Sequence, residues 1–210
     1  MIFNDRLDAG RKLAEALVAY CSQNPLVLAI PRGAVPMGAL IADELHGELD
    51  VVLVHKLSSQ WDPEYAIGAI DESGWSCLTD PSGGDATWLA QEKARRLGGL
   101  KQRRALYSPA RPPIDPKGRI VIVVDDGLAT GATMMAALHA VRAAKPRKLI
   151  CAVPVAAPDS LKAVEPYADE TVCLSAPWDF RSVGQFYHVF GQVEDDEVVA
   201  CLEGRKGKNP

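Results

Sequence analysis

The chain has 210 residues, 48% of them hydrophobic and 24% charged, a composition typical of a soluble globular protein with one sizeable core. Its net charge of −4 argues against a general binder of nucleic acid or acidic membranes, and no apolar stretch is long enough to span a bilayer or to form a secretion signal. Five scattered cysteines favour reduced thiols in the cytoplasm over a disulfide framework or a zinc site.

The hydrophobic pattern predicts alternating helices and strands. Helices are expected at residues 6–20, 35–45, 85–107 and 159–167, and a further one ends at residue 144. The pair Gly98-Gly99 is a candidate break in the third. Strands are expected at residues 26–30, 51–57, 121–124, 148–153 and 170–174, with a hairpin from 66–70 to 75–79 and a proline-rich loop at 108–117. This alternation indicates one α/β domain over residues 1–210, with a mainly parallel central sheet and helices on both faces.

The most informative stretch is Val-Ile-Val-Val-Asp-Asp-Gly-Leu-Ala-Thr-Gly-Ala-Thr at residues 121–133. A buried strand ends in Asp125 and Asp126, at the edge of a parallel sheet where ligands bind. The two carboxylates can accept hydrogen bonds from vicinal ribose hydroxyls or hold a metal through water. The following loop offers backbone N–H groups, hydroxyls and a helix N-terminus to a phosphate monoester. It consists of Ala129, Thr130, Gly131, Ala132 and Thr133.

This run resembles the phosphoribosyl pyrophosphate (PRPP) motif of the type I phosphoribosyltransferase family. The resemblance implies that Asp125 and Asp126 contact the ribose hydroxyls and that the loop holds the 5′-phosphate. It also implies the fold of that family, in which a small hood is added to the sheet. The hood is expected to come from the chain ends, at about residues 1–20 and 175–205.

A second strand leads into a helix through a small-residue loop at residues 29–36, where Arg32 is the only charged residue. A guanidinium there can bind two phosphate oxygens, and Gly33 allows close backbone approach. The alternative is a surface arginine in a turn. The resemblance implies that Arg32 and Gly33 bind the pyrophosphate, and that a cis peptide bond lies among Pro31, Arg32 and Gly33.

Lys56 ends a predicted strand, so its ammonium group can reach the same rim as Arg32. The polar residues after it suit a mobile loop. Together with Pro63-Glu64-x-Ala-x-Gly-Ala, Lys56 resembles the "predicted phosphoribosyltransferase" subgroup, whose members are mostly named from sequence. The implied role of Lys56 is to stabilise charge on pyrophosphate. Glu64 is an acid, a base, a metal-shell group or simply a loop carboxylate, and His55 is expected to be structural.

The resemblance implies a mechanism in which pyrophosphate leaves PRPP and a nitrogenous base takes its place on the ribose. The catalytic set is then Lys56, Arg32, Asp125 and Asp126, assisted by Mg²⁺ that arrives with PRPP and needs no firm protein ligand. Ala129 stands where enzymes acting on 6-oxopurines often carry an acid. This departure disfavours hypoxanthine and guanine as acceptors.

The sequence gives a weaker indication of the acceptor site. Four aromatic residues near the C-terminal end can stack on a flat ring or can be ordinary core: Trp178, Phe180, Phe186 and Tyr187. A basic run on the long predicted helix is either a solvated helix face or an RNA-binding surface, and the acidic net charge favours the former. The run comprises Lys93, Arg95, Arg96, Lys101, Arg103 and Arg104.

Two functions remain open on this evidence. The first is a cytoplasmic phosphoribosyltransferase of nucleotide salvage that uses PRPP and a nucleobase-like acceptor, with a homodimer as a candidate assembly. The second is a regulatory protein that binds PRPP without transferase turnover. Retention of both Arg32 and Lys56 favours the enzyme, because sensing requires less stabilisation of a leaving group.

Overall fold

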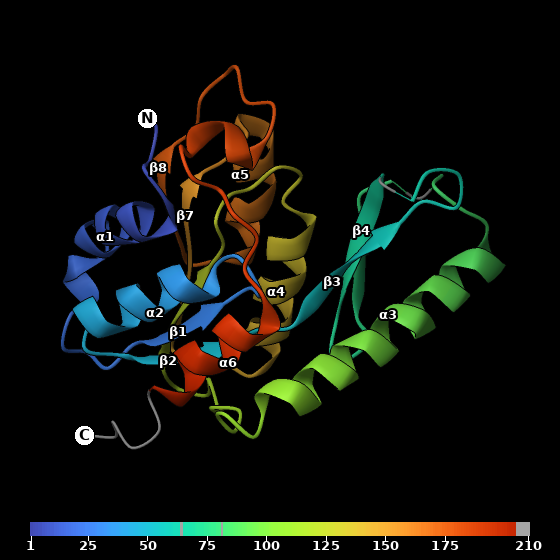
Figure 1. Cartoon of the computed structure of the whole chain (residues 1–210). Helices are drawn as coiled ribbons and strands as arrows, with labels where there is room; N and C mark the ends of the chain where they lie inside the picture. The colour runs from blue at the N-terminus through green and yellow to red at the C-terminus, as the bar shows by residue number, and fades with distance from the viewer. Residues whose placement is uncertain (64, 81, 205–210) are drawn as a thin grey trace.

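The computed structural model describes residues 1–63, 65–80 and 82–204. Its centre is a five-stranded parallel sheet with the strand order β2-β1-β6-β7-β8 (Figure 1). The strands are β1 (Leu26–Ala29), β2 (Glu48–Val51), β6 (Ile120–Val124), β7 (Lys148–Val155) and β8 (Glu170–Ser175). This arrangement confirms the predicted α/β class and its mainly parallel sheet.

Alternate residues of the buried strands serve two separate cores. Val27 and Ile122 pack with the helices α1 (Arg6–Ala16), α2 (Val35–Glu44) and α6 (Asp195–Glu203). Their neighbours Leu28 and Val123 pack on the opposite face with α4 (Ala132–Ala143) and α5 (Pro158–Val164). Because both faces are covered, these strands are apolar throughout rather than alternating with polar residues.

A second sheet stands beside the first. Its antiparallel strands are β3 (Val54–Ser58), β4 (Ala66–Asp71) and β5 (Ser76–Leu78). The long helix α3 (Ala86–Tyr107) packs against β3 and β4, and α4 of the main domain also contacts this sheet. Figure 1 shows the second sheet and α3 projecting to one side of α4. We call this unit the side lobe, residues 54–107.

Several predicted boundaries were wrong. The expected strand at 51–57 is two strands in different sheets, because β2 ends at Val51 beside β1 whereas β3 pairs with β4. The expected first helix stops at Ala16 and is followed by a 3-10 turn, η1 (Val18–Tyr20). The helix α3 continues through Gly98 and Gly99 without a break. The predicted hairpin is confirmed as β4 and β5.

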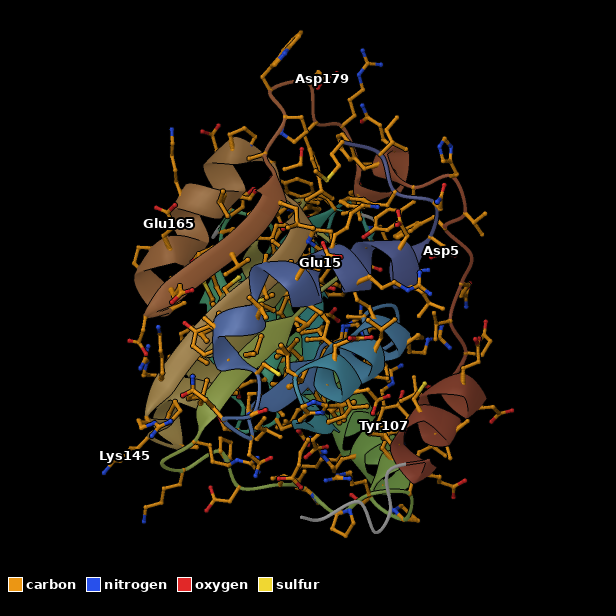
Figure 2. The ribbon with its side chains drawn as sticks, turned by 90° about the vertical axis from the view of Figure 1, so that its left-hand side faces the viewer. Asp5, Glu15, Tyr107, Lys145, Glu165 and Asp179 are labelled. Carbon is orange, nitrogen blue, oxygen red and sulfur yellow. The ribbon has the colours of Figure 1, made fainter. Side chains whose placement is uncertain are left out.

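The N-terminal segment meets the segment after β8 near the carboxyl ends of the parallel strands. Phe3 forms a bridge with Tyr187, just after the 3-10 helix η3 (Val183–Phe186). A third 3-10 helix, η2 (Glu165–Tyr167), precedes β8. In Figure 2, Asp179 marks the loop after β8 at one end of the molecule, and Lys145, just before β7, marks the other. No helix in the described ranges has the length and apolarity needed to cross a membrane. Cys21, Cys77, Cys151 and Cys173 carry free thiols.

Candidate active site

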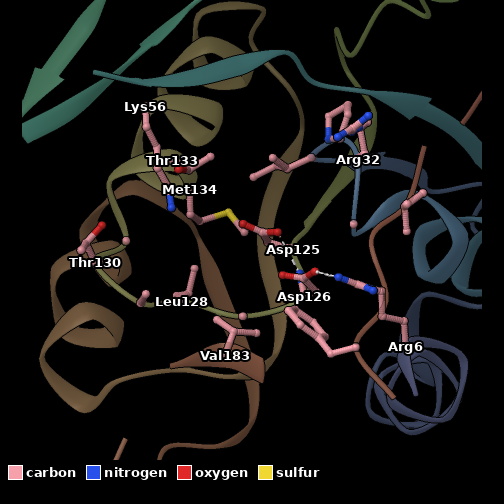
Figure 3. A pocket seen from close by; sticks show the side chains of 18 of the residues that line it. Arg6, Arg32, Lys56, Asp125, Asp126, Leu128, Thr130, Thr133, Met134 and Val183 are labelled. Atoms are coloured by element: carbon pink, nitrogen blue, oxygen red, sulfur yellow. Dashed lines mark hydrogen bonds and ion pairs between the residues drawn. The ribbon is translucent and has the colours of Figure 1, made fainter. Parts of the chain in front are cut away.

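A cleft of about 430 Å³ lies where the predicted strands end (Figure 3). It contains the predicted residues Arg32, Gly33, Lys56, Asp125, Asp126, Ala129, Thr130, Gly131 and Thr133. Ala132 follows in the first turn of α4 and is buried behind this loop. Residues separated by about a hundred positions therefore share one cavity.

The loop after β6 has the geometry of an anion cradle. Gly131 has a φ of 76°, a left-handed conformation that favours glycine, and it is the N-cap of α4. The loop is held from behind by Ser160, whose hydroxyl donates a 2.6 Å hydrogen bond to the carbonyl of Ala129. The Thr133 hydroxyl is buried and has no hydrogen-bond partner among the described residues. An acceptor oxygen from a ligand would satisfy it, since buried hydroxyls rarely stay unpaired.

The acid pair at the end of β6 is strongly perturbed. Burial and the neighbouring Asp126 raise the pKa of Asp125 well above its usual range. Burial also raises the pKa of Asp126, although Arg6 opposes this effect. The Asp126 backbone N–H donates to Asp125 Oδ1 at 2.8 Å, which fixes the first carboxylate. Both carboxyls line the cleft, where they can accept hydrogen bonds from hydroxyls.

Arg6 is a residue of the cleft that the sequence did not reveal. Its Nε and Nη2 atoms each lie 2.9 Å from Asp126 Oδ2 (Figure 3). Its guanidinium lies 4.0 Å from the centre of the Phe190 ring, and Nη1 donates to the carbonyl of Gly191. Because Arg6 is 120 positions from Asp126, no local pattern points to this pair.

The loop after β1 approaches the acid pair closely. The peptide bond between Pro31 and Arg32 is cis, which confirms the expectation for this loop. A Cβ atom on Gly33 would lie 2.3 Å from Asp126 Oδ2, so a larger residue would displace the carboxylate that Arg6 holds. Arg32 Nη1 lies 2.7 Å from Glu194 Oε2 and 3.7 Å from Asp195 Oδ2. The guanidinium on this rim is therefore already paired with carboxylates of the chain.

Lys56 reaches the cleft from the side lobe. Its side chain is exposed, and no carboxylate of the described residues lies within ion-pair distance of it. The neighbouring His55 turns away: Nδ1 lies 2.8 Å from the Lys56 carbonyl and Nε2 lies 3.4 Å from Arg96 Nη1. Burial lowers the pKa of His55. Glu64 lies outside the described residues.

A family model described as the phosphoribosyl transferase domain matches residues 2–189. The chain belongs to the phosphoribosyltransferase family. A curated Mycobacterium tuberculosis protein, named as a phosphoribosyl transferase, is 41% identical over 206 residues that cover 96% of this chain and 46% of that protein. The chain thus spans about half the length of the curated relatives it matches. The crystal structure of TT1426 from Thermus thermophilus is 44% identical, with a TM-score of 0.83 over 97% of this chain and 99% of that one.

The aromatic residues predicted for the acceptor end of this phosphoribosyltransferase do not line its cleft. Phe186 and Tyr187 are buried in the core, Phe180 packs against that core, and Trp178 is 91% exposed away from the cleft. The Tyr187 hydroxyl instead donates to the Asp126 carbonyl at 2.8 Å, which braces the acid pair from behind. The residues of the C-terminal segment that do line the cleft are Val183, Phe190, Gln192 and Val193.

Most of the basic run on α3 is engaged in ion pairs within the chain. Arg95 and Arg96 both pair with the buried Glu92, and Arg104 pairs with Glu72. Arg103 lies 3.9 Å from Asp195 of α6. Lys93 and Lys101 form no ion pair with any residue that the structure describes. These contacts give four of the six charges a structural role.

Proposed function

We propose that this phosphoribosyltransferase binds PRPP and transfers its ribose 5-phosphate to a nitrogenous base, releasing pyrophosphate. The observation that carries the proposal is the unpaired, buried hydroxyl of Thr133 in the left-handed turn at Gly131, in the same cleft as the two carboxyls and the cations Arg32 and Lys56. A phosphate at the loop, a ribose at the carboxyls and a pyrophosphate at these cations would give each of these groups a partner.

The chemistry follows from where charge develops. Loss of pyrophosphate places positive charge on the ribose and negative charge on the leaving oxygens. Asp125 and Asp126 would hold the ribose hydroxyls and favour the positive charge beside them. Arg32, Lys56 and the backbone at Gly33 would stabilise the leaving oxygens.

Mg²⁺ fits this site as a companion of PRPP. Within the described ranges, no group of three or more His, Cys, Asp or Glu side chains can hold a metal ion by itself. The oxygens of pyrophosphate would supply ligands, and the cation would neutralise part of their charge. The residues of the chain then hold the sugar and the outer phosphate oxygens.

The acceptor would bind where Val183 and Phe190 line the cleft. Val183 offers an apolar contact, and Gln192 offers an amide that can donate and accept. Ala129 supplies no carboxyl to assist a 6-oxopurine, so we do not expect hypoxanthine or guanine to be the preferred acceptor. We place the reaction in cytoplasmic nucleotide salvage.

A PRPP-binding regulatory protein is the second candidate, because Arg32 is engaged by Glu194 rather than held open for a leaving group. The two are separated by measuring pyrophosphate release from PRPP with Mg²⁺ across a panel of purines and pyrimidines. Release that depends on a base supports the transferase. Tight PRPP binding without such release supports the regulator, and no binding excludes both.

The Lys56→Met variant refines this test. We expect it to lower kcat more than it weakens PRPP binding, because the developing charge on pyrophosphate is greatest in the transition state. The matched control is Lys101→Met, which removes an exposed lysine of the side lobe away from the cleft. Equal losses in the two variants would contradict the role of Lys56.

A further inference from the structure

One segment of the chain touches both charged ends of the cleft. Residues 190–195, which we call the strap, run from Phe190 into the first turn of α6. Figure 1 shows the chain there, in red, passing between α2 and α4 before it enters α6. Phe190, Gln192 and Val193 of the strap line the cleft.

Two arginines of the cleft fasten the strap. At one end, Arg6 lies over the Phe190 ring, donates to the Gly191 carbonyl and pairs with Asp126. At the other end, Arg32 pairs with Glu194 at 2.7 Å and lies 3.7 Å from Asp195. The strap is therefore linked through Arg6 to the carboxyl of Asp126, and it pairs directly with Arg32, the cation proposed for pyrophosphate.

The ion pair between Arg32 and Glu194 is one that an anionic ligand could replace. Glu194 presents a carboxylate to the guanidinium as a phosphate oxygen would. Its side chain is 58% exposed, so the contact is weakened by solvent and can be exchanged for a more highly charged anion. Asp195 has other partners in addition, since it accepts from the Tyr107 hydroxyl and lies near Arg103. Glu194 also accepts from the Glu197 backbone N–H in the capping box of α6, so it can release Arg32 and keep this contact while α6 stays docked.

We propose that Glu194 is a positioning residue that occupies Arg32 in place of pyrophosphate, and that pyrophosphate binding displaces it and loosens the strap. This inference rests on the proposed function, because it requires Arg32 to bind pyrophosphate. Release of the strap changes the wall of the cleft at Phe190 and Gln192. It thereby connects occupancy of the pyrophosphate end to the end proposed for the acceptor.

The first test measures the Kd of pyrophosphate with Mg²⁺ by calorimetry. Glu194→Gln removes the competing charge and keeps a side-chain oxygen for the helix cap. We expect about two- to five-fold tighter binding, the size of one exposed ion pair. In an Arg32→Gln background, the same substitution should have no effect, because the group it competes for is gone.

Glu197→Ala is the matched control. Glu197 belongs to the same turn and forms the other half of the capping box, accepting from the Glu194 N–H at 3.0 Å. The variant loses one negative charge and one cap contact but leaves the Arg32–Glu194 pair intact. Its Kd should be unchanged. Equal tightening in both variants, or tightening that persists without Arg32, overturns the inference.

The second test follows hydrogen exchange of the strap amides in the wild-type protein. We expect faster exchange at residues 190–195 when pyrophosphate and Mg²⁺ are added, and slower or unchanged exchange contradicts release. If the wild type binds pyrophosphate and Glu194→Gln binds it no better, only this inference fails. If the wild type binds no pyrophosphate at millimolar concentration, the inference and the proposed function both fail.

Discussion

The carboxyls of Asp125 and Asp126 are suited to ligand binding but lower the stability of the free protein. Burial raises both pKa values, and the neighbouring Asp126 adds to the effect at Asp125, so the ionised pair costs free energy in the unliganded protein. Arg6 offsets part of this cost at Asp126, and the Tyr187 hydroxyl braces the backbone behind it. A ribose with two hydroxyl donors would offset more of it.

Asp125→Asn should therefore stabilise the free protein while weakening PRPP binding. Asparagine keeps an acceptor for the Asp126 N–H but carries no charge. We expect the free energy of unfolding to rise by about 0.5–2 kcal/mol at neutral pH. Thermal unfolding and PRPP titration of both proteins measure the two effects.

The stability gain should also depend on pH. Because the folded pKa of Asp125 is raised, its destabilising contribution is complete above that value and disappears as the pH falls toward the unfolded value of 3.8. The difference in Tm between Asp125→Asn and the wild type should thus shrink as the buffer becomes more acidic. A difference that grows on acidification contradicts the assigned direction of the shift.

The hydroxyls of the loop after β6 provide a second residue-scale prediction. Thr133→Val should weaken PRPP binding by about 1–3 kcal/mol, because a buried phosphate contact is left unmade. Free-protein stability should stay the same or rise, since the hydroxyl has no partner among the described residues. We expect Thr130→Val to weaken PRPP binding over the same range. Unchanged affinity in both variants would show that the loop does not hold the phosphate.

At the scale of residues, the sequence was most informative where the candidate site residues are contiguous in the chain. The acid pair and the loop to Thr133 come from one unbroken run, so their joint placement follows from a strand leading into a helix. Arg6 and Phe190 could not be found in this way, because they reach the cleft only through tertiary packing. Phe186 and Tyr187 were candidates for contact with the acceptor but are buried in the core, because an aromatic residue is as suitable in a core as beside a ligand.

At the scale of elements, the start of α4 depends on one backbone conformation. Gly131→Ala places a side chain at φ 76° and brings its Cβ to 3.0 Å from Val164 Cγ2. We expect a loss of about 1–2 kcal/mol in the free energy of unfolding, together with weaker PRPP binding. Urea unfolding checks the first effect and calorimetry the second.

Gly99→Ala in α3 is the matched control for this glycine. Nothing lies within 4 Å of an added Cβ there, and the helix is continuous. The substitution should stabilise the protein by about 0.5–1 kcal/mol. Destabilisation by Gly99→Ala would mean that the helix is bent or broken at this point.

The same glycines explain why one boundary was mispredicted. Gly98-Gly99 weakens helix propensity locally, but α3 packs against β3 and β4 along its length and remains one helix. The opposite error occurred at the apolar run from Val51 to Val54, where one continuous strand was predicted and two strands are present. Its residues are equally hydrophobic in both sheets, so composition did not mark where one strand ends and the next begins.

On the scale of the whole molecule, the side lobe is held to the main domain by the contacts of α4 with β3, β4 and β5 and of α3 with α6. Trp75 of the hairpin turn stacks on His139 of α4, with ring centres 3.5 Å apart. Within the lobe, Glu92 is buried and receives hydrogen bonds from Arg95 and Arg96, which join α3 to the neighbourhood of Lys56. The position of Lys56 on the cleft therefore depends on packing outside the parallel sheet.

Glu92→Gln should loosen this lobe selectively. Burial raises the pKa of Glu92, but the hydrogen bonds from Arg96 and Arg95 lower it further, so the pKa lies below its usual value. Its stabilising contribution is thus present above the unfolded value of 4.5 and is lost as the pH falls. We expect a loss of about 2–3 kcal/mol, seen as faster hydrogen exchange in β3 and α3. Lys101→Gln is the charge-loss control, and uniform exchange across both sheets would contradict a local role.

The parallel sheet was predictable because its strands are apolar on both faces and alternate with helices. The side lobe was only partly predictable: the hairpin and the helix each had a local signal, but their association did not. That association is determined by long-range pairs such as Trp75 with His139, which have no periodic pattern. The sequence consequently predicted the acid pair and the loop to Thr133 better than the C-terminal residues that line the cleft.

The central claim is that one cleft binds the phosphate, the ribose and the pyrophosphate of PRPP together. Calorimetric titration of the protein with PRPP and Mg²⁺, repeated with ribose 5-phosphate and with pyrophosphate as competitors, tests it most directly. The account predicts one site per chain, competition by both fragments, and weaker binding in Asp125→Asn and Thr133→Val. The absence of saturable binding, or binding that neither fragment displaces, would contradict it.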